Sequence, residues 1–337
     1  MANGATLNLY DGATTAMAIN GLTLATGSSL GFDLNAPTVN DILNLTGTAN
    51  VTPTVSLNFN NLGGLGVGTY DLINVSAGTL SATDYVLGIA PSGLNYNFST
   101  INSNQTLRLT TSTLNLVYWH GDETPGGSSW STLNGAGPFT TNWATTSTGT
   151  TDLGALPAST DTLVFSNTNA TGPAIATTLD GNFTADSLQF TANPSGVTSV
   201  AVNQGTSGTL TLTPVSANNG IAVATNAGAI SIGAPVATGA VQTWEVIGGG
   251  ANGSSLTVSG AVAVNHLINK TGAGNLTLSG SNSGAGGINL AAGSLIIGHN
   301  NALGTGPFTI GAGTTIHTGA SVIANAGHNV QNWDGNF

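Results

Sequence analysis

Four short segments between residues 251 and 321 repeat one pattern: Leu256-Thr-Val-Ser-Gly, Leu276-Thr-Leu-Ser-Gly, Leu295-Ile-Ile-Gly-His and Thr315-Ile-His-Thr-Gly. Their first residues are spaced by 20, 19 and 20 positions. Each of the first three segments is followed, 12 or 13 residues later, by a second apolar position. A period of this length, which holds strands and turns, is typical of coils that stack on one another. We therefore predict an all-β chain that forms a parallel β-helix (β-solenoid) with a right-handed coil.

The repeat also predicts which residues lie inside and which form turns. The apolar residues at equivalent positions are expected to stack in the core, and these are Leu256, Ile268, Leu276, Ile288, Leu295 and Phe308. Asparagines follow two of the leading residues after about six positions, where each coil should turn: Asn282, Asn300 and Asn301. Asparagine tolerates the left-handed conformation and can bond to the same residue type in the next coil. We therefore predict a ladder of asparagines along one edge.

Composition excludes several classes of protein. Only 4% of the 337 residues are charged, and the two basic residues, Arg108 and Lys270, stand against thirteen acidic ones. A nucleic-acid partner needs a basic surface, which this chain cannot build. Cysteine is absent, so disulfides, thiolate catalysis and cysteine-based zinc sites are impossible. With 49 glycines and a surface left to Thr, Ser and Asn, the composition favours strands and turns over helices.

The pattern changes along the chain and indicates three regions. Residues 1–117 are predicted to form the end of one β-solenoid with closing coils, because larger aromatic residues gather toward the end of this region. Residues 118–165 are rich in Gly, Ser, Thr and Pro and are predicted to be a junction that contains Trp119, Trp130 and Trp143. Residues 166–337 are predicted to form a second solenoid. We expect the whole chain to be a segment of a longer protein.

One stretch, residues 266–310, resembles a known family of repeats. It contains Lys270-Thr-Gly-Ala-Gly-Asn-Leu-Thr-Leu-Ser-Gly-Ser-Asn, followed by Gly286-Gly-Ile-Asn-Leu-Ala-Ala-Gly-Ser-Leu. This order of lysine, paired glycines and asparagine is similar to the autotransporter-associated β-strand repeat. One departure is Ser283-Gly-Ala, where the family often has an aromatic residue. More weakly, residues 68–109 resemble the closing coils of autotransporter passengers.

The resemblance implies a location and a shape. It implies a passenger segment that is secreted through a C-terminal barrel outside this chain and displayed on the bacterial outer-membrane surface. There it would form a rigid stalk or fibre with an adhesive role. Glycans, other surface proteins and end-to-end copies of the chain are the candidate partners, and the membrane would be reached only through that barrel. No cofactor or metal is expected, and the chain is not expected to be an enzyme.

Two other functions stay open from the residues. Trp119, Trp130 and Trp143 could form a platform on which sugar rings stack, as in a carbohydrate-binding module. We favour the alternative that they plug the open end of a coil stack, since large apolar rings are usually buried.

The second is a polysaccharide lyase or hydrolase, which would need a basic residue beside a metal or two facing carboxylates. The pairs Asp122 with Glu123 and Asp180 with Asp186 are more typical of turns, and Lys270 is expected to be a solvated charge that caps strand ends. His299 and His317 are 18 residues apart and could stack on adjacent coils, but two imidazoles make a weak metal site.

Overall fold

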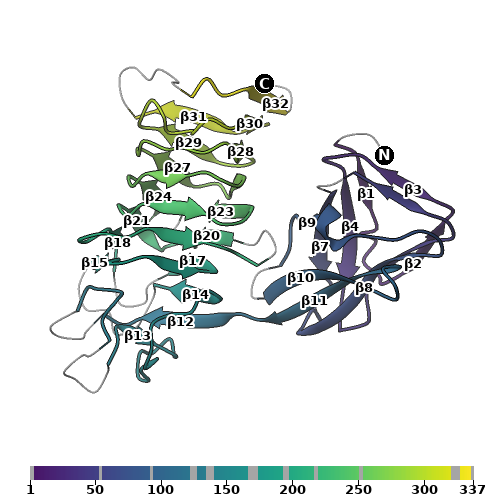
Figure 1. Ribbon diagram of the computed structural model, residues 1–337, viewed down its shortest axis with the longest axis horizontal. Coiled ribbons are helices and arrows are strands. Elements are labelled where there is room, and N and C mark those ends of the chain that lie inside the picture. The colour runs from purple at the N-terminus through teal and green to yellow at the C-terminus, as the bar shows by residue number, and fades with distance from the viewer. Residues whose placement is uncertain are drawn as a thin grey trace. The chain divides into compact units, whose positions relative to one another are not determined.

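The structure is a computed structural model that describes residues 4–52, 55–91, 94–121, 127–133, 140–165, 174–192, 197–215, 219–249, 253–319 and 327–334. Within these ranges the only helix is a single 3-10 turn, Ala82–Asp84, and the remaining elements are strands. Most strands pair in parallel with the equivalent strand of the next coil, so the predicted all-β parallel β-solenoid is confirmed (Figure 1).

The chain divides into two compact units. The first unit comprises Met1–Leu114 with the short segment Val215–Asn218, and the second comprises Asn115–Pro214 and Asn219–Phe337. The segment 118–165, predicted as a junction, lies inside the second unit, where two of its strands join the main sheet.

Successive coils of the second unit contribute strands to three sheets. In the described part of the chain, the largest has ten strands in the order β13 (Trp143–Ala144), β12 (Asn115–Trp119), β14 (Asp161–Val164), β17 (Ser187–Phe190), β20 (Asn219–Val223), β23 (Gln242–Val246), β26 (Ile268–Thr271), β28 (Ile288–Leu290), β30 (Phe308–Gly311) and β32 (Gln331–Asp334). The second sheet has the order β15 (Ala174–Thr178), β18 (Ser199–Asn203), β21 (Gly228–Ile232), β24 (Ser254–Val258), β27 (Asn275–Leu278), β29 (Ser294–Ile297) and β31 (Thr315–Thr318). The third holds β16 (Phe183–Ala185), β19 (Leu210–Leu212), β22 (Val236–Thr238) and β25 (Val262–Ala263).

The repeat positions lie above one another in this stack. Leu256 pairs in register with Leu276 and Leu276 with Leu295, while Ile268 pairs with Ile288 and Ile288 with Phe308. All six side chains are buried. These apolar columns, bounded by the three sheets, make up the core of the second unit.

The fourth segment of the repeat is shifted by one residue from the predicted alignment. The structure pairs Leu295 with Ile316, so Thr315 lies above Ser294 instead of above Leu295. The connection from Leu295 to Phe308 takes 13 residues, one more than that from Leu256 to Ile268, while the turn before β31 is as long as the turn before β27. In the turn before β31 the hydroxyl of Thr314 donates to the carbonyl of Gly311 at 2.6 Å.

The first unit begins as a stack of parallel coils and ends in antiparallel strands. One sheet has the order β1 (Thr6–Asn8), β4 (Ser29–Leu34), β7 (Val55–Asn61) and β9 (Tyr85–Leu87), and β3 (Leu22–Leu24) pairs with β6 (Ala49–Val51). The other sheet has the order β10 (Leu94–Ile101), β11 (Thr106–Thr113), β8 (Gly68–Val75), β5 (Ile42–Leu45) and β2 (Ala16–Ile19). The pairs β8–β11 and β11–β10 are antiparallel.

Aromatic side chains cover the core where these antiparallel strands close the first unit. The ring of Phe59 stacks on Tyr96 with centroids 6.1 Å apart and contacts Phe98 at 6.2 Å. Tyr70 and Tyr85 are buried nearby in the same core cluster. The large residues therefore fill the last layer of this unit, where no parallel coil follows.

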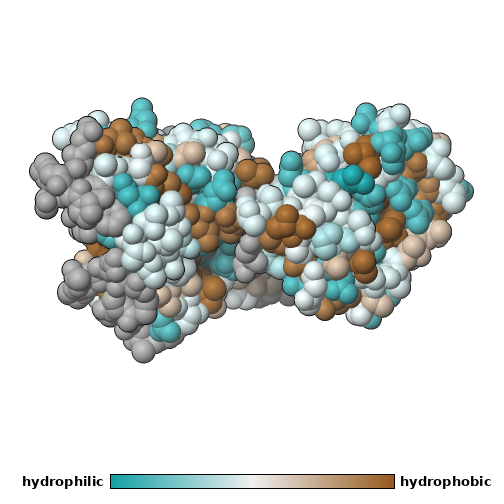
Figure 2. All heavy atoms as spheres, turned by 90° about the horizontal axis from the view of Figure 1, so that it is seen from below, coloured by the Kyte–Doolittle hydropathy of each residue, from teal (hydrophilic) through white to brown (hydrophobic). Residues whose placement is uncertain are grey.

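The outer surface is built mainly from small, uncharged residues. In Figure 2, pale residues of intermediate hydropathy alternate with scattered teal and brown ones on the face that is shown. Thr257 and Thr277, for example, are register partners that alternate with buried leucines and point outward. Such a surface is solvated through hydroxyl groups and not through charge.

We expect the columns to dominate the stability of the second unit. Leu276→Ala should lower its free energy of unfolding by about 2–5 kcal/mol, because it opens a cavity between Leu256 and Leu295. Thr277→Ala, on the outer face of the same strand, should change it by less than about 0.5 kcal/mol. All five tryptophans lie in the second unit, so tryptophan fluorescence during urea unfolding reports on this unit alone. Equal effects of the two substitutions would contradict the stacked register.

Candidate functional site

The three tryptophans of the predicted junction lie together at the first coil of the second unit. Trp119 comes from β12 and Trp143 from β13, and their rings meet edge to face with centroids 5.0 Å apart. Trp130 meets Trp143 at 5.2 Å and Phe183 at 5.5 Å. The rings are between 0% and 3% exposed. The cluster therefore covers the first layer of the core.

The polar edges of two of these rings are engaged inside the cluster. The indole nitrogen of Trp130 donates to the hydroxyl of Thr177 at 3.0 Å, and that of Trp143 donates to the carbonyl of Trp130 at 3.2 Å. Below them, Phe165 stacks on Phe190 at 5.1 Å and continues the aromatic column into the stack. A sugar platform needs exposed ring faces, which this arrangement does not provide.

Hydrogen bonds to the Asp152 side chain hold the segment that carries Trp143. The carboxylate of Asp152 accepts hydrogen bonds from the amide and hydroxyl of Thr140, both at 2.7 Å, and from the hydroxyl of Thr141 at 2.6 Å. Burial raises the pKa of this carboxyl, but the hydrogen bonds from Thr140, Thr141 and Gly154 outweigh it and lower the pKa to about 2. Asp152 is therefore ionised at neutral pH and fixes the turn over the plug.

The predicted asparagine ladder takes a different form. Asn282 is buried, its side-chain oxygen accepts from the amide of Val262 at 2.8 Å, and its side-chain nitrogen donates to the carbonyl of Ala302 at 2.6 Å. It therefore joins three successive coils through main-chain groups. Asn301 bonds to the hydroxyl of Ser281 at 3.3 Å, and Asn300 is exposed.

Bonds between stacked asparagines occur at other positions. The side-chain nitrogen of Asn289 donates to the oxygen of Asn269 at 3.2 Å, and Asn74 donates to Asn44 at 2.9 Å in the first unit. These residues lie on strands, where equivalent positions of adjacent coils face outward and are register partners. Strand positions fix side-chain distance better than the turns, which is why the predicted turn residues do not pair with one another.

Lys270 is buried, which corrects the expectation of a solvated charge. It occupies an inward position of β26, between register partners Trp244 and Leu290, and is 0% exposed. Its ammonium group donates to the carbonyls of Thr271 at 2.8 Å, Gly272 at 2.9 Å and Ala292 at 3.1 Å. Because two of these carbonyls belong to its own turn and one to the next coil, Lys270 ties two coils together from inside.

The glycines that follow Lys270 are required by the same close stacking. Gly272 has φ +73°, and a Cβ there would collide with the carbonyl of Val246 in the preceding coil. Gly293, with φ +74°, sits in the same way over the carbonyl of Gly272. A side chain at either position would push two coils apart.

The other basic residue, Arg108, is also engaged. Its guanidinium forms a bidentate pair with the carboxylate of Asp71, with nitrogen–oxygen distances of 2.6 and 3.1 Å. The hydrogen bond to Asp71 raises the pKa of Arg108. Arg108 and Lys270 belong to different units, and both serve contacts between strands or coils.

The acidic pairs considered for catalysis are not assembled into a site in the described residues. Asp122 and Glu123 lie outside those residues. Asp180 has φ +49° and bonds to the amide of Thr206 at 3.0 Å, a contact that lowers the pKa of its carboxyl. Asp186 is buried and accepts from the hydroxyl of Ser187 at 3.0 Å. Asp180 and Asp186 are therefore each engaged by a hydrogen bond to a nearby turn or strand residue.

The two histidines do not stack. The register places His317 above Ile296, while the ring nitrogen of His299 accepts from the amide of Asn301 at 3.0 Å. Among the residues that the structure describes, no group of three or more His, Asp or Glu side chains could hold a metal ion.

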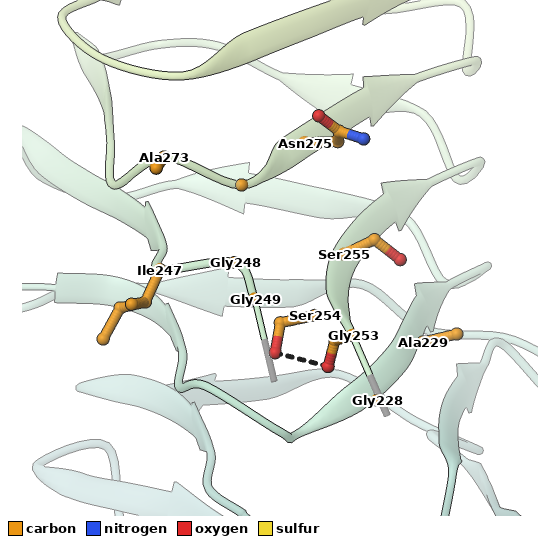
Figure 3. Close-up of a pocket in the computed structure, with 11 residues that line it drawn as sticks. Gly228, Ala229, Ile247, Gly248, Gly249, Gly253, Ser254, Ser255, Ala273 and Asn275 are labelled. Carbon is orange, nitrogen blue, oxygen red and sulfur yellow. Dashed lines mark hydrogen bonds between the residues drawn. The ribbon is translucent and has the colours of Figure 1, made fainter. Parts of the chain in front are cut away.

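One surface hollow of about 430 Å³ lies beside the turns that join β23 to β24 and β26 to β27 (Figure 3). Its walls are mostly glycine main chain and small side chains, among them Gly248, Gly274 and Asn275. The hydroxyl of Ser254 is engaged with the carbonyls of Ala224 at 2.6 Å and Gly253 at 2.7 Å, the second drawn dashed in Figure 3. The described residues of the lining include no charged side chain.

Comparisons with known proteins do not assign the chain to a family. No protein-family model, no curated protein and no solved structure matches the chain. In the described ranges, no helix is long and apolar enough to cross a membrane.

We expect Trp130→Ala to destabilise the second unit by about 3–5 kcal/mol, because it leaves a large cavity beneath Trp143 and Phe183. Urea unfolding followed by far-UV circular dichroism measures the change. Trp333→Ala is the matched control, since that ring is 59% exposed. A folded Trp130→Ala protein of unchanged stability would show that the ring does not plug the core.

The buried ammonium predicts a pH dependence for the second unit. Burial lowers the pKa of Lys270 from 10.5 to about 8, and the attraction of Glu245 offsets only part of this shift. Between these two values the unfolded chain holds the proton and the folded chain does not. The free energy of unfolding should therefore rise with pH across this window, by on the order of 3 kcal/mol in total.

Tryptophan fluorescence during urea unfolding at pH 7, 8, 9 and 10 checks this rise in the second unit alone. Lys270→Met should remove the rise, because the variant lacks the ammonium group whose pKa burial lowers into this window. The same slope in the variant and the parent would assign the effect to another residue.

Proposed function

We propose that this chain is a rigid structural segment of a secreted passenger displayed on a bacterial cell surface, where it forms part of a stalk or fibre. The observation that carries the proposal is the in-register stack of the second unit. Apolar columns continue from coil to coil, and main-chain hydrogen bonds join each coil to the next. Such a stack resists bending and grows lengthwise without a larger core.

The residues that carry the resemblance to the autotransporter-associated repeat support this proposal through the contacts they make. Lys270 joins two coils, Gly272 allows their close approach, and Asn282 bridges three coils. Every one of these residues serves stacking and none is held free for a ligand. A motif used in this way is suited to a structural repeat.

The surface and the two basic residues also suit an extracellular environment. Proteases of trypsin-like specificity cleave only after Lys or Arg. Lys270 is fully buried, and Arg108 lies on β11, between its antiparallel neighbours β10 and β8, and is paired with Asp71. Both cleavable peptide bonds therefore lie within hydrogen-bonded strands, which hinders such proteases in the folded chain, while the hydroxyl-rich exterior keeps the chain soluble.

The alternatives gain no support from the arrangement of side chains. The carbohydrate-binding module depended on Trp119, Trp130 and Trp143, whose rings are buried. The polysaccharide-degrading enzyme depended on a free base or paired carboxylates, and those that the structure describes are used in turns and ion pairs. That the chain is not an enzyme stays a prediction.

Surface display can be tested on the cells that produce the protein. An antibody raised against the folded chain should stain intact cells, and brief treatment of those cells with proteinase K should remove the signal. An antibody against a cytoplasmic protein, which should stain only permeabilised cells, is the control. Staining that requires permeabilisation would overturn the proposal of a displayed stalk.

A further inference from the structure

The pattern Asn-X-Ser or Asn-X-Thr, with any residue except proline at X, is the acceptor sequence for N-linked sugars in secreted proteins. It occurs ten times in this chain, which is rich in Asn, Ser and Thr, so the sequence alone does not select a site. The surroundings of these asparagines in the fold separate the side chains that are already used from those that can accept a sugar. Eight of them lie in the described residues: Asn44, Asn50, Asn74, Asn97, Asn104, Asn182, Asn269 and Asn275.

Five of these side chains are engaged in the fold. Asn44 accepts from Asn74 at 2.9 Å, and Asn269 accepts from the equivalent asparagine of the next coil at 3.2 Å. The side-chain oxygens of Asn104 and Asn182 accept hydrogen bonds at 2.7 and 3.0 Å. A sugar on any of these residues would have to fit beside a contact that fixes the side chain. The other three are exposed, and these are Asn50, Asn97 and Asn275.

Asn275 and the threonine of its pattern lie side by side on the outer face of the second unit. Asn275 begins β27, Leu276 points into the core, and Thr277 follows on the same face as Asn275. The register partners of Asn275 are Ser255 in the preceding coil and Ser294 in the following one, and both are small. The side chain of Asn275 makes no hydrogen bond within the described residues. Its amide nitrogen is therefore open to a reagent that approaches from solvent.

Asn275 also lines the hollow of about 430 Å³ described above (Figure 3). This volume is within the range of small-molecule sites and exceeds that of one pyranose ring. Ile247 in the lining is 44% exposed and offers an apolar surface to the C–H face of a sugar, while Ser255 offers a hydroxyl group. Because the described lining includes no charged side chain, it suits a neutral sugar better than a charged one.

One turn beside the hollow exposes its main chain. Gly248 and Gly249 have φ +79° and +75°, in the region that favours glycine, and Gly249 is exposed. A residue with a side chain would be strained at either position, so the turn cannot cover its own peptide groups at these two residues. A sugar ring held in the hollow would cover them from outside.

We propose that Asn275 carries an N-linked neutral sugar whose first ring lies in this hollow. The side-chain nitrogen attacks C1 of a sugar that bears a phosphate leaving group. The bond from C1 to the phosphate oxygen breaks, its electron pair leaves with the phosphate, and the amide proton passes to a base of the transferase. The inference rests on the proposed function, because the acceptor pattern is meaningful on the surface of a secreted protein.

Mass spectrometry of the protein purified from the cells that produce it tests the modification. Trypsin cleaves the unfolded chain after Arg108 and Lys270, and within residues 271–337 the acceptor pattern occurs only at Asn275. The fragment that begins at Thr271 should be heavier by at least one hexose or N-acetylhexosamine, and fragmentation should place the addition on Asn275. Asn275→Gln should lack the addition.

The outcome is distinguishable from failure of the proposed function. An unmodified fragment from cells that the antibody stains intact would overturn the sugar at Asn275 and leave the displayed stalk in place. An unmodified fragment from cells that stain only after permeabilisation would overturn both.

Two threonine variants test whether the acceptor pattern directs the modification. Thr277→Val should abolish the addition although Asn275 remains, because the hydroxyl of the pattern is lost. Thr257→Val is the matched control, since Thr257 is the register partner of Thr277 and follows Ser255 in the same way. It should leave the sugar in place. Circular dichroism verifies that both variants fold, and equal modification of the two would overturn the assignment.

Hydrogen exchange tests whether the sugar lies in the hollow. In the modified protein, peptides that cover Ile247–Gly249 should exchange several-fold more slowly than in Asn275→Gln, because the ring covers the turn. Peptides that cover β18 (Ser199–Asn203), which lies outside the lining of the hollow, should exchange equally in both proteins. A sugar on Asn275 with equal exchange at Ile247–Gly249 would overturn its placement in the hollow.

Discussion

The register of one coil on the next is the constraint on which this structure depends. Main-chain hydrogen bonds between parallel strands fix the vertical spacing, so each side chain must fit the residues directly above and below it. In the second unit this requirement gives the columns Leu256–Leu276–Leu295 and Ile268–Ile288–Phe308. At the turns the same requirement selects Gly272 and Gly293, because a Cβ would collide with the coil beneath.

The sequence was sufficient to predict what the period controls directly. The parallel β-solenoid fold followed from spacing and alternation, because these apolar residues recur at nearly fixed intervals. The first departure came at Thr315, where one extra residue between Leu295 and Phe308 moved the register by one and placed Ile316 in the column. The longer offset of 13 residues was visible in the sequence, but the spacing of the leading residues alone did not show which residue would enter the column.

The roles of individual polar residues were harder to predict. Lys270 was expected in solvent because lysine is rarely buried alone. Its position two residues after Ile268 put it on the inward face, so the alternation did contain the signal. Three carbonyls offset the loss of hydration, and these come from turns whose geometry only the fold supplies. Asn282 was expected to bond to another asparagine, and its main-chain partners depend on the same three-dimensional detail.

The columns also restrict how such a chain can change in length. Removing one complete repeat, such as residues 268–287, would bring Ile288 to the place of Ile268 and leave inward and outward positions unchanged. Removing an odd number of residues from a strand would instead turn its apolar side chains outward and its polar ones inward. Evolution can therefore lengthen or shorten this stack readily in whole coils, whereas partial changes are restricted to the turns between strands.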